Sequence, residues 1–358
     1  MAKTLEEILG WEPRTAGVKD PAGGVPTDVL PPGFFTGTRP VRGYKSSYLR
    51  REDTRKTATI VGYDSPATPA GKGDTAEVPV ILVHSFEFQQ HGALLLANLL
   101  TDNDAVQKMA EEELNYQTAL LKQRQDNLRT ASMMSMLTLG YLYFNGQNLL
   151  PSSVGATLTV DYSATTGNTY IGAWDTTGTD IGAQMMNIRT AVRKDNGLKI
   201  TECLYGANLF GYLAANDTIK NLTNGTPGWA ASMAQGMIPQ GQLGLNWWPA
   251  SDTWFEDQDG TNQDFFDADS ISLFPSPSSA WYELQEGSYP VPTNLGNVAG
   301  TATAALADFV EVYGMFAYAT MTNNPVGVQQ FVGDTFLPVA KTPGAINIVA
   351  AVTTAVGG

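Results

Sequence analysis

The segment TAEVPVILVHSFEFQQHGALLLANLL (residues 75–100), together with the TDNDAVQKMAEEELNYQTALLKQ that follows it (residues 101–123), determines the fold predicted for this chain. The first part is typical of the returning strand of a long ribbon over residues 39–90. The second part opens a helix expected over residues 101–144. A lone two-stranded ribbon is marginal in water, and so long a helix exceeds the needs of one small domain. We therefore expect neighbouring subunits to complete the core.

The ribbon is expected to be basic and aromatic. Its β-branched content and Pro/Gly placement predict a strand over residues 54–63, a tip over residues 64–74 and a returning strand over residues 75–90. Its cations alternate with tyrosines, and the set is Arg39, Arg42, Tyr44, Lys45, Tyr48, Arg50, Arg51, Arg55, Lys56 and Tyr63. This pattern favours either a surface for single-stranded nucleic acid or a charged ribbon that docks on an acidic partner.

The long helix has a clear start and an apolar end. Residues 101–104 supply capping side chains and acids in the first turn, where the helix dipole favours them. From Ala131 onward the segment is apolar on nearly every side, so this end must enter a core. A methionine stripe at Met133, Met134 and Met136 is expected to belong to that core rather than to a cofactor site.

The charge is acidic overall and uneven along the chain. The formal net charge is −14, and the pI is near 4.5. Residues 1–72 carry 11 Lys/Arg against 8 Asp/Glu, whereas no Lys, Arg or His lies between Lys220 and Lys341. A general nucleic-acid reader should show the opposite balance. We therefore favour a basic ribbon that meets acids on another subunit, with Arg50, Arg51 and Arg55 as the predicted contacts.

The remaining chain alternates helices and strands. We predict a short helix capped by Thr4 and Glu7, and an extended arm over residues 12–38. Further helices are expected at residues 179–194, ended by Asn196-Gly197, and at residues 209–222. Strands are expected at residues 158–162, 198–205, 271–274 and 345–352, and a helix or strand at residues 309–320.

No pattern for catalysis or cofactor binding is found. The two histidines, His84 and His91, form neither a triad nor a helical metal pair, and nucleotide-binding glycine motifs are missing. The single cysteine, Cys203, sits in an apolar strand and should be an inert buried thiol. We therefore expect no enzyme activity, no cofactor and no metal.

A different reading of one region stays open. Carboxylates near three tryptophans in residues 247–269 could bind or cleave a sugar, although an acidic loop over packed tryptophans accounts for the same residues. No run of about 18 apolar residues predicts a membrane span, and no apolar signal core begins the chain. We expect a protein kept in the cytoplasm where it is made.

Three segments carry a resemblance to a known family. They are residues 75–123, quoted above; GAWDTTGTDIGAQMMNIRTAVRKDNGLKITECLYGANLFGYLAANDTIKNL (residues 172–222); and VYGMFAYATMTNNPVGVQQFVGDTFLPVAKTPGAINIVAAV (residues 312–352). In order and length they resemble the major capsid protein of tailed bacteriophages, in the lambda-type branch of the Hong Kong 97 capsid fold. The resemblance covers about residues 25–355.

That resemblance implies an α+β fold with named parts. Residues 1–38 would be an N-terminal arm, and residues 39–90 an extended loop lying across a neighbouring subunit. Residues 91–197 would form a peripheral domain whose spine helix spans residues 101–144. Residues 198–334 would form an axial domain, and residues 335–358 would return to the core. The extended-loop residues expected at subunit contacts are Arg39, Arg42, Tyr44, Lys45, Arg50, Arg51, Arg55 and Lys56.

The resemblance also implies partners and a location. Copies of the chain would form hexamers and pentamers of an icosahedral head that encloses double-stranded DNA without reading its sequence. Portal, scaffolding and decoration proteins are further expected partners, scaffolding being a separate or removed segment because no long segment precedes the arm. The protein would assemble in the host cytoplasm and reside in the virion. A nanocompartment shell of the same fold is the alternative, and no cross-linking lysine is assigned.

Overall fold

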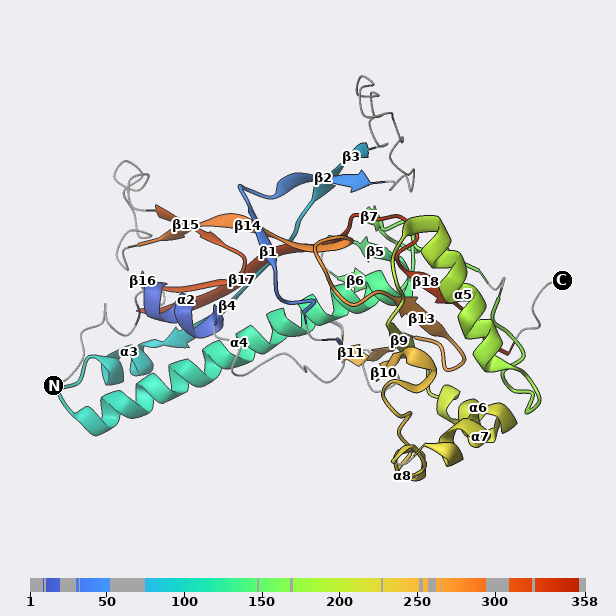
Figure 1. The fold of residues 1–358 in the computed structure, drawn as a ribbon. Coiled ribbons are helices and arrows are strands. Elements are labelled where there is room, and N and C mark those ends of the chain that lie inside the picture. The colour runs from blue at the N-terminus through green and yellow to red at the C-terminus, as the bar shows by residue number, and fades with distance from the viewer. Residues whose placement is uncertain are drawn as a thin grey trace, which may run out of the picture.

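One long helix, α4 (Asp104–Thr138), forms the axis along which the other elements lie (Figure 1). The computed structural model describes residues 9, 11–19, 30–31, 33–51, 75–146, 148–167, 170–226, 228–250, 254–256, 262–264, 266–293, 309–323 and 326–353. At about 1.5 Å per residue, the 35 residues of α4 span roughly 50 Å. The helix therefore connects two separate sheets at a distance that short helices cannot bridge.

Helix α4 begins where the sequence predicts but ends earlier than predicted. Asn103 caps the N-terminus by accepting a hydrogen bond from the backbone N–H of Ala105. Every residue from Thr130 to Thr138 is buried. The predicted extension to residue 144 is wrong, because residues 141–144 form strand β5 (Tyr141–Phe144).

The helix stops where glycine is required. Gly140 has φ of +72°, and a Cβ there would lie 2.6 Å from the Cβ of Ala164. Only glycine meets both conditions at low cost. The turn reverses the chain into the aromatic segment Tyr-Leu-Tyr-Phe, whose side chains favour a strand. Strand β5 then pairs with β6 (Leu149–Leu150) and β7 (Leu158–Asp161).

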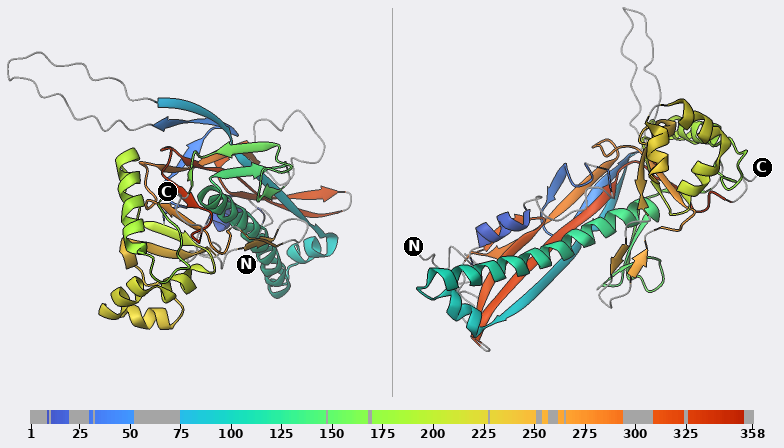
Figure 2. Two further views of the ribbon diagram at one scale, coloured as in Figure 1. Left: turned by 90° about the vertical axis from the view of Figure 1, so that its right-hand side faces the viewer. Right: turned by 90° about the horizontal axis from the view of Figure 1, so that it is seen from below.

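A six-stranded sheet lies along α4 (Figure 2). Its central strand is β17 (Val326–Ala340), which pairs antiparallel with β4 (Val83–Gly92), β16 (Phe316–Asn323) and β14 (Tyr282–Pro292). Strands β15 (Phe309–Tyr313) and β1 (Thr38–Val41) pair with β14. Helix α3 (Ala93–Leu99) links β4 to α4. One sheet face packs on α4, so both elements share a core.

The predicted ribbon is shorter in the structure than in the sequence analysis. Strands β2 (Lys45–Arg51) and β3 (Thr75–Ile81) pair with each other, but residues 83–92 leave the ribbon and join the large sheet as β4. Their pairing with β17 leaves one face of β4 half-buried and the other exposed, and the partner strand lies too far along the chain for local patterns to reveal it. The predicted strand over residues 54–63 and the tip lie outside the described residues.

The second sheet forms a separate lobe with its own core. Its order is β10 (Asn246–Pro249), β9 (Glu202–Tyr205), β13 (Ile271–Phe274), β18 (Asn347–Val349) and β8 (Thr165–Thr166). Helices α5 (Ile181–Asn196), α6 (Leu209–Ala215), α7 (Asp217–Gly225) and α8 (Trp229–Ala234) accompany it. Gly197 ends α5 with φ of +80°, which confirms the predicted left-handed cap.

Two predicted elements need correction. The helix expected over residues 209–222 is broken at Asn216, whose side chain accepts hydrogen bonds from the N–H groups of Thr218 and Ile219 and so starts α7. Residues 11–19 form helix α2 (Trp11–Lys19) rather than an extended arm, because buried Val18 packs against Leu121. The predicted cap at Thr4 and Glu7 lies outside the described residues.

The remaining described elements are small. They are the hairpin of β11 (Trp254–Glu256) and β12 (Asn262–Asp264) and the short turn of helix η2 (Gln242–Gly244). Strand pairing joins β14, β15, β16 and β17 to the sheet along α4, whereas β18 belongs to the second lobe. The domain boundaries given above stay a prediction.

A buried ion network ties α4 to the large sheet. The Arg129 Nε donates to Asp334 Oδ2, and its Nη2 donates to Asp334 Oδ1 at 2.7 Å and to Glu286 Oε1 at 3.1 Å. The Asp334 side chain is fully buried. Although burial by itself lowers the pKa of Arg129, the two carboxylates outweigh it and raise that pKa. The helix therefore holds the Arg129 guanidinium between a carboxylate of β14 and a carboxylate of β17.

Removing this cation should be costly. In Arg129→Ala, Asp334 remains buried without its partner, and we expect a loss of about 3–5 kcal/mol in the free energy of unfolding. Arg124→Ala on the same helix is the control, because the Arg124–Glu87 pair is exposed on its arginine side and should contribute less than about 1 kcal/mol. Urea unfolding of unassembled protein measures both. Equal losses would contradict the role assigned to Arg129.

A second prediction concerns Asp126, which is 5% exposed. Burial raises its pKa to about 6, against the opposing charges of Lys122 and Arg129. The folded state then holds a proton that the unfolded state loses near pH 4, so stability falls as the pH rises from about 4 to 6. Asp126→Asn should therefore raise the free energy of unfolding at pH 7 by roughly 1–3 kcal/mol and change little at pH 4. Urea unfolding of both proteins at pH 4 and pH 7 measures this. A gain at pH 4 that is larger than the gain at pH 7 would contradict the prediction.

Candidate assembly interface

Strands β2 and β3 form a ribbon that stands away from the body of the molecule (Figures 1 and 2). Their register runs from Lys45 opposite Ile81 to Arg51 opposite Thr75. Along it only Tyr48 and Val80 are buried among the side chains that the structure describes. The ribbon is thus anchored through Tyr48 and Val80, with Val78 partly buried against the same core, and the rest of its described surface is half-buried or exposed.

The base of the ribbon is fixed to the large sheet. Tyr48 is 2% exposed and packs in the main core with Val80 and Leu82. The N–H of Leu82 donates to the carbonyl of Tyr44 at 2.9 Å, and the N–H of Gly43 donates to Ser288 Oγ at 2.8 Å. The direction in which the ribbon leaves the body is therefore set by the fold.

The first of the predicted contact residues is bound to its own chain. Arg39 pairs with Glu283 at 3.3 Å, and Glu283 also binds Lys341 at 3.0 Å. Burial alone would raise the pKa of Glu283, but Lys341 and then Arg39 outweigh it and lower that pKa. This acid belongs to the Lys/Arg-free stretch after Lys220, so the chain's own acids meet part of its basic segment.

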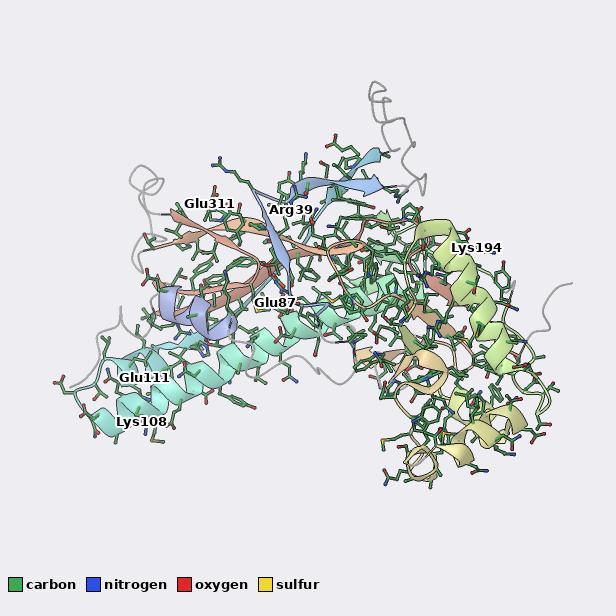
Figure 3. All side chains as sticks on the ribbon, viewed as in Figure 1. Arg39, Glu87, Lys108, Glu111, Lys194 and Glu311 are labelled. Atoms are coloured by element: carbon green, nitrogen blue, oxygen red, sulfur yellow. The ribbon has the colours of Figure 1, made fainter. Side chains whose placement is uncertain are left out.

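Among the other described cations of this segment, Arg42 and Lys45 are exposed and Arg50 is half-buried; Figure 3 labels Glu311, the acid that Arg42 meets. Arg42 meets Glu311 at 3.3 Å, but its side chain is 84% exposed, so the pair is weak. Arg50 donates from Nη2 to the carbonyl of Asp161 at 3.2 Å. The Lys45 ammonium lies 5.6 Å from the ring centre of Tyr44. The Arg51 side chain, Arg55 and Lys56 lie outside the described residues.

Apolar side chains are also exposed on and beside the ribbon. Tyr44, Leu49 and Ile81 are 56%, 50% and 42% exposed. Clustered exposed apolar residues on a soluble protein mark a surface that meets a partner. The ribbon and the residues just before it therefore combine cations that make only weak contacts within the chain with apolar side chains suited to a contact.

An aromatic row covers the face of the large sheet that points away from α4. Tyr289 stacks on Phe316 at 4.3 Å and on His84 at 5.3 Å, and Phe86 stacks on Phe331 at 5.4 Å. Phe86 and Phe88 nevertheless remain 39% and 57% exposed. The sequence analysis did not single out these residues, although the alternation HSFEFQQ is the signal that could have found them.

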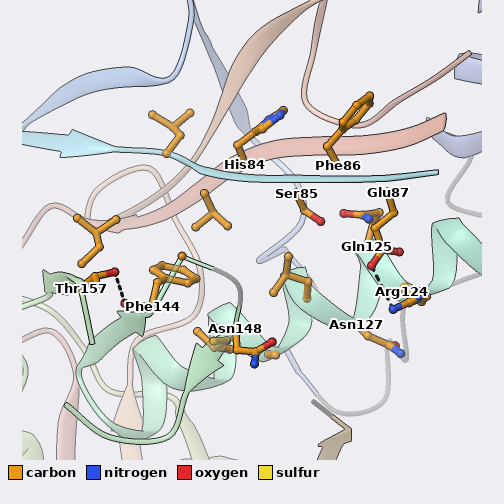
Figure 4. A pocket seen from close by; sticks show the side chains of 17 residues that line it. His84, Ser85, Phe86, Glu87, Arg124, Gln125, Asn127, Phe144, Asn148 and Thr157 are labelled. Carbon is orange, nitrogen blue, oxygen red and sulfur yellow. Dashed lines mark hydrogen bonds and ion pairs between the residues drawn. The ribbon is translucent and has the colours of Figure 1, made fainter. Parts of the chain in front are cut away.

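A groove of about 520 Å³ lies beside β4 (Figure 4). One wall is the run of residues 82–87, another is α4 from Arg124 to Ala131, and the third comes from Phe144, Asn148 and Thr157 near β5 to β7. Glu87 and Arg124 pair across one end at 3.2 Å. The groove is polar at this end and apolar at the other.

The region once read as a sugar site has a packing role where it is described. Trp247 is 2% exposed, and its Nε1 donates to the carbonyl of Gln242. The Trp248 Nε1 donates to Glu202 at 2.8 Å. The Trp247 ring is therefore closed to a sugar, and the half-buried Trp248 packs against the main core. Trp254 and most of the acidic run have no described side chains.

The remaining reactive side chains are held in packing contacts. Cys203 is fully buried, and burial raises the pKa of its thiol, as expected of an inert cysteine. His84 contacts Thr335 at 2.8 Å and His91 contacts Gln330 at 3.3 Å, with burial lowering both pKa values. The described residues contain no cluster of metal-binding side chains and no helix able to cross a membrane.

Comparison with known proteins points to one family. The sequence model of the family described as phage major capsid protein E matches residues 25–350. No curated protein matches the sequence. Among solved structures, a phage-related protein from Bordetella bronchiseptica shares 10% identity at a TM-score of 0.47, covering 95% of this chain and 97% of that one.

Two other solved structures have similar coverage. A virus-like particle from Pyrococcus furiosus is 11% identical at a TM-score of 0.40, covering 95% of this chain and 98% of that one. An encapsulin complex from Synechococcus elongatus is 11% identical at a TM-score of 0.40, covering 88% and 85%.

The ribbon offers a test that separates anchoring from contact. Tyr48→Ala removes a buried aromatic ring and should lower the free energy of unfolding by about 3–5 kcal/mol. Leu49→Ala changes a half-exposed neighbour and should stay within about 0.5 kcal/mol. Chemical unfolding of unassembled protein measures both. A large loss in Leu49→Ala would show that this side chain packs within the chain.

Proposed function

The chain belongs to the phage major capsid protein E family, whose members are structural proteins of the virion capsid. We propose that copies of the chain form a shell in which the ribbon of each subunit is covered by a neighbouring subunit. Its copies associate into hexamers and pentamers of a closed icosahedral head. The role is structural rather than catalytic. The order of arm, ribbon, long helix and mixed lobes supports this reading.

The ribbon is the observation that carries the proposal. Strands β2 and β3 have a single buried side chain each among those described, yet their base is fixed by Tyr48 and Leu82. A two-stranded segment that is held in direction but has only one buried side chain in each strand buries little surface within its own subunit. It gains stability only when another subunit covers it.

The predicted contact set follows from the same feature. Arg42 already pairs with Glu311 of its own chain. Tyr44 and Lys45 are exposed, Arg50 is half-buried, and Arg51, Arg55 and Lys56 continue the basic run in sequence. We assign Tyr44, Lys45, Arg50, Arg51, Arg55 and Lys56 to contacts with a neighbouring subunit, where charge complementarity between their cations and its acids sets the register of assembly. Arg39, already bound to Glu283, would help to fix the base of the ribbon.

The finer assignments are part of this proposal. Residues 1–38 act as an arm, the ribbon of β2 and β3 as an extended loop, α4 with the six-stranded sheet as a peripheral domain, and the second lobe as an axial domain. The shell assembles in the host cytoplasm and encloses double-stranded DNA without sequence-specific contacts, which suits a net charge of −14. Portal, scaffolding and decoration proteins are its further partners.

Electron microscopy of the purified protein tests the proposal. Closed shells or capsomer rings are expected, and double-stranded DNA in shells made during infection distinguishes a virus head from a nanocompartment. Replacing Arg50, Arg51 and Arg55 together with Glu should prevent closure, because three charges are reversed at the contact and each copy's net charge falls by six units. The control replaces Arg193, Lys194 and Lys199 with Glu, which changes net charge equally on an exposed part of the second lobe. Normal shells from the ribbon variant would refute the assigned contact.

A further inference from the structure

Strand β4 lies at an open edge of the large sheet (Figure 2). Among the described residues it pairs only with β17, through ten consecutive positions. Natural edge strands are commonly protected by lysine, proline, bulges or a covering element. Strand β4, with the sequence VHSFEFQQHG, contains neither lysine nor proline, and Glu87 is its one carboxylate. This edge is therefore competent to accept another strand.

The groove runs along that same edge. Six consecutive residues, from Leu82 to Glu87, line it. Because successive side chains of a strand point to opposite faces, a consecutive run can line a groove only if the strand presents its edge. The far wall is formed by residues near β5, β6 and β7 (Figure 4). The space beside the unpaired backbone is thus already a channel.

Two buried acceptors in the groove have no partner. Gln125 is 1% exposed, and its Oε1 has no hydrogen bond among the described residues. Glu87 Oε2 is likewise buried and without a hydrogen bond, while Oε1 of the same carboxylate pairs with Arg124. Leaving such acceptors unsatisfied costs about 1–3 kcal/mol each. An occupant that donates hydrogen bonds here would recover that cost.

The side chains of β4 specify the occupant. On one face of β4, the exposed Phe86 and Phe88 would be covered best by apolar side chains of the added strand. On the other face, Glu87, together with Gln125 of α4, could accept hydrogen bonds from donors or cations of that strand. An extended segment that is basic, bears an exposed apolar side chain and has a free edge of its own meets these requirements.

Strand β2 fits this description within the same chain. Its sequence KSSYLRR contains three cations and no acid, and Leu49 is half exposed. Among the described residues it pairs only with β3, so its other edge is open. Strand β3 fits less well, because Pro79 lacks a backbone donor and Glu77 would bring a second carboxylate to an edge that already carries Glu87.

We propose that the open edge of β4 and its groove receive strand β2 of a second copy, which extends the large sheet across the subunit boundary. Backbone hydrogen bonds supply the affinity, and the two rows of side chains set the register. The inference rests on the proposed function, since it names the surface that the ribbon occupies. It adds a defined receiving strand, β4, and a receiving groove.

Disulfide trapping tests the pairing. Gln89→Cys is combined in turn with Ser46→Cys, Ser47→Cys, Leu49→Cys and Arg50→Cys, because neighbouring strands bring Cβ atoms to the roughly 3.5–4.5 Å that a disulfide needs. The one native cysteine, Cys203, is buried and does not compete. The control joins Ser47→Cys with Val154→Cys, on an exposed loop outside the groove. At least one β4–β2 pair should give several-fold more covalent dimer than the control, in shells only.

The outcomes separate this inference from the proposed function. Closed shells without cross-linking in any of the four pairs would overturn the β4–β2 contact and leave the capsid role intact. If the parent chain formed no shells or rings, the proposed function and this inference would fall together. Cross-linking equal to the control would also overturn the pairing.

A second variant avoids dependence on cysteine. Phe88→Lys places a charge on the open edge and should lower the yield of shells at least about ten-fold at equal protein concentration, equivalent to ~1.4 kcal/mol. Met186→Lys is the control, since this residue is similarly exposed, at 66%, but lies on α5. Equal shell yields for the two variants, with unchanged unfolding curves, would contradict the proposal.

Discussion

The buried contact of Arg129 with Asp334 and Glu286 is the constraint on which the rest of the structure depends. It holds one point of a helix against the two strands that organise the sheet, β17 and β14. A buried ion pair is not by itself a source of great stability, because desolvation offsets much of the attraction. It does make any other alignment of helix and sheet expensive, since a shifted helix would leave Asp334 buried and unpaired. The network therefore fixes register more than it adds free energy.

The register between α4 and the large sheet also determines where the ribbon lies. Strand β17 holds β4 along ten pairs, β4 continues through Leu82 into β3, and β3 pairs with β2. The orientation of the ribbon thus derives from the sheet, and that of the sheet from α4. A family of shell proteins needs such a chain of dependence, because small errors in the angle of a projecting element would prevent a closed shell.

Local signals in the sequence predicted local features. Asn196-Gly197 predicted the cap of α5, and the apolar run after Ala131 predicted the buried end of α4. The end of α4 was missed because the need for Gly140 comes from Ala164, in a different segment. The partners of Arg39 and Arg42 were expected on another copy, yet both meet acids of their own chain. The pairing of Arg129 with Asp334 was not predicted, although two opposite charges that each lie beside apolar residues are candidates for a buried contact.

Leu82 alone separates the ribbon from the central sheet. A pull on β3 along its own axis therefore passes through one residue into β4, with no flexible linker to absorb it. Strand β4 lies antiparallel to β17, so such a pull loads their hydrogen bonds side by side in shear rather than opening them one after another. The load then reaches Arg129 and α4 through Asp334. A shell under internal pressure would carry its tension along this path, from one subunit's ribbon into the spine of the same subunit.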